Sequence, residues 1–62
     1  MCESTAYIFK DGKEEVFFED VNALENIGNE VKLVNIFGES KIIQARIKQF
    51  SLVDHKIILL PY

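Results

Sequence analysis

The side chains best suited to bind a metal are few in this 62-residue chain, which has one cysteine and one histidine. Cys2 directly follows Met1, and His55 lies near the other end of the sequence. Because no third residue is indicated to orient a base or nucleophile, we do not expect an enzyme. A thiolate and an imidazole are, however, good ligands for transition metals.

The position of Cys2 adds donors that an internal cysteine would lack. Its thiolate can combine with the terminal amine and the intervening amide nitrogen in fused chelate rings. Coplanar nitrogen and sulfur donors suit Ni(II) or Cu(II) better than tetrahedral zinc. The amine comes from Met1 if that residue is retained, and from Cys2 if it is removed. One chain offers few ligands, whereas a symmetric dimer brings two copies of Cys2 and His55 around one axis.

Both residues also have simpler interpretations. Cys2 can be a small buried hydrophobic residue at the start of the first strand. His55 can be an ordinary turn residue, hydrogen-bonded to Asp54 or to a backbone carbonyl. In the same turn, Asp54 is the expected side-chain acceptor for nearby backbone N–H groups. The residue types alone leave these alternatives open.

Short strands must position these residues. β-branched and aromatic residues flank Asp11-Gly12, a dipeptide typical of a type I′ hairpin turn. A helical turn beginning at Asp20 or Asn22 is disfavoured, because the stretch is short and rich in asparagine. The expected strands are 5–10, 13–19, 22–27, 31–37, 41–50 and a last strand that begins at Lys56 and is stopped by Pro61.

The fold expected for residues 1–62 is a single all-β domain, a small five- to six-stranded SH3-like or Sm-like barrel. Closure removes the exposed edges that a flat sheet would leave. Four consecutive apolar residues, 57–60, predict burial on both faces, one against the core and the other against a partner chain. A chain this short buries only about 60% of its unfolded surface, which favours association.

Charge and composition narrow the function classes. The net charge of −3 disfavours nucleic-acid binding, which depends on neutralising phosphates. RNA binding nevertheless remains the alternative function, because small barrels use basic and aromatic strand residues for it. The candidates are Lys41, Arg46, Lys48, Phe37 and Phe50. We expect no signal peptide and no membrane span, and the lone cysteine fits the cytoplasm.

Four blocks of sequence carry a resemblance to a known family: "MCE" at the start, "NIFGE" at 35–39, "ARIK" at 45–48 and "LVDHKIIL" at 52–59. In this order and spacing they resemble the CooT family, small nickel-binding accessory proteins of carbon monoxide dehydrogenase maturation that are often labelled RNA-binding. The resemblance implies a homodimer that binds Ni(II) through Cys2, and His55 matches the "LVDH" position. Phe50 stands where an aliphatic residue is expected.

Overall fold

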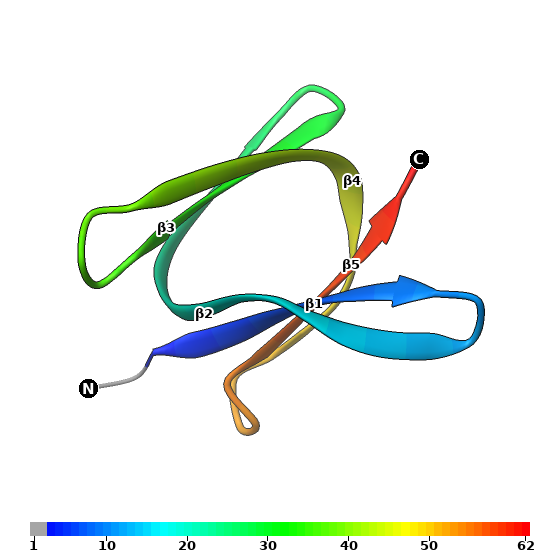
Figure 1. Ribbon diagram of the computed structural model, residues 1–62, viewed down its shortest axis with the longest axis horizontal. Coiled ribbons are helices and arrows are strands. Elements are labelled where there is room, and N and C mark those ends of the chain that lie inside the picture. Colours follow the sequence, from blue (N-terminus) through cyan, green and yellow to red (C-terminus); the bar gives the residue numbers. More distant parts are fainter. Residues whose placement is uncertain (1–2) are drawn as a thin grey trace.

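The computed structural model describes residues 3–62, which form five strands and no helix. In this part of the chain there is accordingly no apolar helix of membrane-spanning length. The strands are β1 (Ser4–Lys10), β2 (Lys13–Ile27), β3 (Glu30–Asn35), β4 (Ser40–Ser51) and β5 (Lys56–Pro61), arranged as Figure 1 shows.

Each strand pairs with the next along the chain, and the ring closes between the first and the last. The four sequential pairs are antiparallel, whereas β1 and β5 run parallel, with Thr5 opposite Lys56 and Ile8 opposite Leu59. The result is a closed barrel. The all-β barrel predicted from the sequence is therefore confirmed, with five strands.

The first hairpin has the predicted geometry. Asp11 and Gly12 both adopt positive φ angles, 54° and 76°, as a type I′ turn requires. Lys10 lies opposite Lys13 on either side of this turn. Local sequence alone was sufficient here, because two residues determine the turn.

The prediction of separate strands at 13–19 and 22–27 is wrong, since β2 is one continuous strand of 15 residues. Its first half pairs with β1 and its second half with β3, and Val21 lies opposite both Ser4 and Asn35. The strand bends at Asp20, whose φ is 58°, and the register shifts on both sides of this point. Such irregularities sharpen the twist of a strand, so β2 can contribute to two sides of the barrel.

The third strand also differs from the prediction, because it ends at Asn35 and leaves Ile36 and Phe37 in the turn that follows. The Asn35 side chain accepts hydrogen bonds from the backbone N–H groups of Phe37 and Glu39. These bonds fold the chain back before the apolar run is finished.

The core fills the barrel with residues from all five strands. Its buried members are Ala6, Val21, Val31, Leu33, Ala45, Ile57 and Leu59. The last strand is buried on both faces, as predicted. Ile58 points away from this cluster, yet it is only 3% exposed within one chain. Contrary to expectation, Ile58 therefore needs no partner chain for its burial.

Candidate metal centre

His55 is the residue before β5, at the end of the turn that connects β4 to β5. Its side chain is exposed, and its backbone has a positive φ of 52°. This conformation is uncommon for a residue with a Cβ, although histidine adopts it more readily than most. Neither predicted hydrogen bond is present, because the imidazole of His55 has no side-chain hydrogen bond within residues 3–62.

The backbone of His55 joins this turn to the start of the first strand. Its carbonyl oxygen accepts a hydrogen bond from the backbone N–H of Thr5 at 2.9 Å. Thr5 is also opposite Lys56 in the parallel pair of β1 and β5. Barrel closure thus brings the beginning of the described chain beside the histidine, although the two are far apart in sequence.

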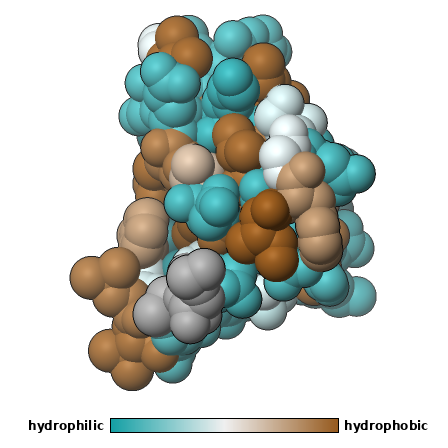
Figure 2. All heavy atoms as spheres, turned by 90° about the vertical axis from the view of Figure 1, so that its left-hand side faces the viewer, coloured by the Kyte–Doolittle hydropathy of each residue, from teal (hydrophilic) through white to brown (hydrophobic). Residues whose placement is uncertain are grey.

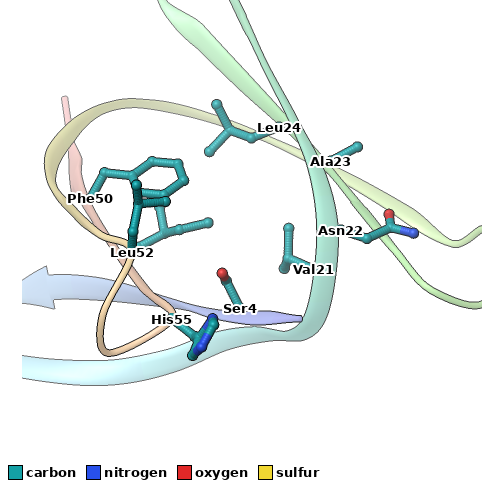
Figure 3. A pocket seen from close by; sticks show the side chains of 9 residues that line it. Ser4, Val21, Asn22, Ala23, Leu24, Phe50, Leu52 and His55 are labelled. Atoms are coloured by element: carbon teal, nitrogen blue, oxygen red, sulfur yellow. The ribbon is translucent and has the colours of Figure 1, made fainter. Parts of the chain in front are cut away.

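A pocket of about 320 Å³ opens at this junction. Figure 3 shows the Ser4 hydroxyl pointing into it, His55 at one edge, and Phe50 and Leu52 across from Val21. Ser4 and His55 thus lie near the start of β1, the third polar lining residue, Asn22, lies on β2, and the remaining wall is apolar. The full lining consists of Ser4, Val21, Asn22, Ala23, Leu24, Phe50, Leu52, His55 and Ile57.

The β4–β5 turn is held differently from the prediction, which gave the role of side-chain acceptor to Asp54. The acceptor is instead Ser51, whose Oγ receives a hydrogen bond from the backbone N–H of Asp54 at 3.2 Å. A serine at the end of a strand is a common local acceptor of this kind. The prediction was therefore wrong about which of two suitable side chains accepts the bond.

The described residues do not by themselves complete a metal site. Within residues 3–62 no three His, Cys, Asp or Glu side chains are grouped as metal ligands would be. Of the three predicted ligands, only His55 lies in this range, and Met1 and Cys2 lie outside the described residues. A metal site that includes His55 would need further donors from the N-terminal residues or from a second chain.

The residues considered for RNA binding have different neighbours. Lys41 lies over the rings of Phe17 and Phe18, with Nζ at 4.9 and 5.1 Å from their centroids. Lys48 instead lies over Phe9, at 4.9 Å. Phe37 is in the β3–β4 turn and Phe50 lines the pocket. These two lysines thus contact rings other than the two aromatic residues considered with them.

A closed five-stranded barrel, with the first strand tied to a histidine-bearing turn, defines a small all-β barrel protein. The family model for the CO dehydrogenase accessory protein CooT matches residues 1–60. This chain therefore belongs to the CooT family, which confirms the resemblance. A crystal structure from Carboxydothermus hydrogenoformans described as CooT is 44% identical, with a TM-score of 0.91 over 98% of each chain. No curated protein was found to match.

Proposed function

We propose that this chain binds Ni(II) through its Cys2 region as a homodimer, and delivers or buffers nickel for carbon monoxide dehydrogenase maturation in the cytoplasm. The hydrogen bond between Thr5 and His55 is the observation that carries the proposal. Cys2 precedes Ser4 by two residues, and two residues of extended chain span at most about 7 Å. Chain length alone thus allows the thiol that we propose as a ligand to reach the pocket that Ser4 and His55 line.

The donor chemistry fits nickel as a cargo. A cysteine thiolate, a terminal amine and an amide nitrogen are the sulfur and nitrogen donors that Ni(II) accepts in a planar arrangement. His55 is exposed at the same pocket and offers an imidazole as a further ligand. Met1 contributes its amine if it is retained, and Cys2 supplies the amine if Met1 is removed.

The surface beside the pocket supports self-association. Three apolar side chains near it are exposed: Phe50 by 49%, Leu52 by 77% and Val53 by 88%. Burying them against a second copy removes apolar area from water, which is the main driving force for association. A two-fold axis at this face would also bring two N-terminal chelates and two copies of His55 together.

The decisive experiment is a nickel titration of the wild type and of Cys2→Ser, followed by absorption spectra. We expect the sulfur-to-nickel charge-transfer band to be absent in the variant and nickel affinity to fall steeply. A matched control, Cys2→Ser with Ser4→Cys, keeps one thiol near the pocket but moves it away from the terminal amine. We expect this double variant to lack the planar nickel spectrum.

Two outcomes would contradict the proposal. Unchanged nickel affinity in Cys2→Ser would exclude the thiolate as a ligand, and full recovery in the double variant would exclude the terminal chelate. Mass spectrometry of the purified chain decides whether Met1 or Cys2 provides the amine. Light scattering with metal analysis tests the dimer, for which we expect one nickel per two chains.

A further inference from the structure

Barrel closure brings Ser4 and His55 to the same edge of the pocket. In the parallel pair of β1 and β5, Thr5 is opposite Lys56, and the N–H of Thr5 donates to the carbonyl of His55 at 2.9 Å. One residue earlier in each segment stand Ser4 and His55. Side chains at the same level of paired segments point to the same face. Both residues accordingly line the pocket, as Figure 3 shows.

The position of Ser4 is also fixed from the side of β2. It lies opposite Val21, a core residue that is only 3% exposed. Ser4 itself is half-buried, and its hydroxyl points into the pocket (Figure 3). Within residues 3–62 neither this hydroxyl nor the imidazole of His55 takes part in a side-chain hydrogen bond. The two polar groups therefore share one edge of the pocket without a bond to any other described side chain.

A histidine that binds a metal needs a second partner. One ring nitrogen binds the metal, and the other carries an N–H that is usually donated to a nearby acceptor, which fixes the orientation of the ring. Asp54 precedes His55 in the chain but does not line the pocket. Asn22 does line it, yet Figure 3 shows its amide directed away from Ser4 and His55. The remaining polar side chain of the pocket is Ser4, whose hydroxyl oxygen can accept an N–H.

The rest of the surroundings favour this hydroxyl over a water molecule as the acceptor. Phe50, Leu52 and Ile57 line the pocket from β4, β5 and the turn between them. This turn is the lowest part of the molecule in Figure 1, and Figure 2 shows hydrophobic side chains gathered at the same end. A fixed water needs two to four polar partners, and these side chains offer none.

We propose that Ser4 is a positioning residue for His55: its hydroxyl accepts the ring N–H that the metal does not use and so holds the imidazole toward the pocket. The inference rests on the proposed function, in which His55 is a further ligand of Ni(II). The hydroxyl is not itself a ligand, because Ni(II) prefers imidazole nitrogen, whereas neutral oxygen donors suit harder cations. The same hydrogen bond selects which ring nitrogen faces the metal.

The test compares nickel titrations of the wild type, Ser4→Ala and Ser4→Thr. We expect Ser4→Ala to weaken nickel affinity by about 10–100-fold, as is typical when the outer partner of a ligand is removed. Ser4→Thr keeps a hydroxyl and should bind close to the wild type. The sulfur-to-nickel band should persist in Ser4→Ala, because the thiolate is unchanged. Ser40→Ala is the matched control, since Ser40 is exposed at the start of β4 and outside the pocket, and it should bind as the wild type does.

Two further measurements separate positioning from a structural role. In urea unfolding without nickel, Ser4→Ala should be about as stable as the wild type, because its hydroxyl has no side-chain partner to lose within residues 3–62. In a double-mutant cycle, Ser4→Ala should have little further effect on nickel affinity once His55→Gly has removed the imidazole.

Three results would overturn the inference about Ser4. Ser4→Ala or His55→Gly could bind nickel as the wild type does, Ser4→Thr could lose as much affinity as Ser4→Ala, or Ser4→Ala could cost the same with and without the imidazole. Any of these, together with loss of nickel in Cys2→Ser, leaves the thiolate proposal standing. Failure of the wild type to bind nickel would overturn both.

Discussion

Two turns of the barrel expose apolar side chains, and these turns differ in the hydrogen bonds that hold them in place. The β3–β4 turn presents Ile36 and Phe37, and the side chain of Asn35 makes three hydrogen bonds that hold it. The β4–β5 turn presents Leu52 and Val53, with a single internal side-chain bond to Ser51. Its other fixed point is the bond from Thr5 to the carbonyl of His55.

The difference shows how one small barrel can hold a rigid turn, β3–β4, and a more adaptable turn, β4–β5. The first turn is held by the side chain of Asn35 and by the bond from Ile36 to Asp20 of β2, independently of the chain terminus. The second depends on the start of β1, where the barrel closes (Figure 1). Regions with few internal hydrogen bonds open at lower free energy than the core. A metal that engages the N-terminal residues would therefore stabilise the β4–β5 turn more than the β3–β4 turn.

The largest effect should follow from Asn35→Ala. The variant loses three hydrogen bonds at a buried side chain, each contributing about 0.5–1.5 kcal/mol. We expect the free energy of unfolding to fall by about 2–3 kcal/mol, measured by urea denaturation. The corresponding change in the other turn, Ser51→Ala, should lower it by about 0.5 kcal/mol, because water can replace this exposed bond.

A second variant separates the acceptor from the donor in the first turn. Asn35→Asp retains an oxygen for the N–H groups of Phe37 and Glu39 but loses the donor to the Glu39 carboxylate. Because the new carboxylate oxygen faces Glu39 Oε1, repulsion offsets the retained acceptor, so at neutral pH its stability should be no higher than that of Asn35→Ala. Equal losses in Asn35→Ala and Ser51→Ala would show that the two turns are held equally well and would remove the contrast.

The next prediction concerns His55. The effect of its positive φ on stability and its proposed role as a nickel ligand can be tested separately. Glycine adopts this conformation without strain, whereas alanine keeps the Cβ that disfavours it. We expect His55→Gly to be more stable than His55→Ala by about 1 kcal/mol in thermal unfolding. If the imidazole binds nickel, both variants should lose affinity to the same extent.

The outcome that would contradict ligation by His55 is wild-type nickel affinity in either variant. If only His55→Ala loses affinity, the backbone shape of the turn is what matters. A control at Asp11, which also has a positive φ but lies in the β1–β2 turn, is Asp11→Gly. It should leave nickel affinity unchanged, because the pocket is lined by other residues.

The sequence was informative where a short local pattern has one dominant structural outcome. Asp11-Gly12 identified the first hairpin, and alternation identified the inward residues Ile43, Ala45 and Ile47 of β4. The bend of β2 was not predicted. The positive φ of Asp20 lets β2 pair with β1 before the bend and with β3 after it, so the bend depends on long-range pairing and not on a local turn signal. The parallel pairing of β1 with β5 joins the two ends of the chain, and no local pattern encodes it.

For the candidate site, the types of ligand could be predicted from the sequence, but which residues lie close together in the fold could not. His55 was selected as the only histidine, whereas its bond to Thr5 and the shared pocket with Ser4 depend on barrel closure. The hydrogen bonds by which Asn35 holds the β3–β4 turn were also not predicted, although Asn35 begins the "NIFGE" block. An asparagine shortly before a glycine is a typical turn signal, and it could have indicated that the strand ends there. Cys2 lies outside the described residues, so its ligation stays a proposal.

The smallest effect concerns an ion pair beside the β4–β5 turn. Lys56 Nζ lies 2.8 Å from Glu14 Oε1, which links the first residue of β5 to β2. This hydrogen bond is the largest cause that raises the pKa of Lys56 above its ordinary value of 10.5, with smaller contributions from the charges of Tyr7 and Asp54. The folded state therefore binds the lysine proton more tightly than the unfolded state does.

The contribution of this pair to stability should be complete below pH 10.5 and should disappear as the pH rises through the higher pKa of folded Lys56. A double-mutant cycle of Lys56→Met and Glu14→Gln is measured by urea unfolding at pH 8 and pH ~11.5. The cycle isolates the Lys56–Glu14 interaction from the titration of other groups. We expect a small favourable coupling at the lower pH and a smaller one at the higher. Lys41→Met is the control, since Lys41 donates to the carbonyl of Phe17 and lies over Phe17 and Phe18, and it should not couple to Glu14. Equal coupling at both pH values would show that the ammonium charge of Lys56 is not what ties the β4–β5 turn to β2.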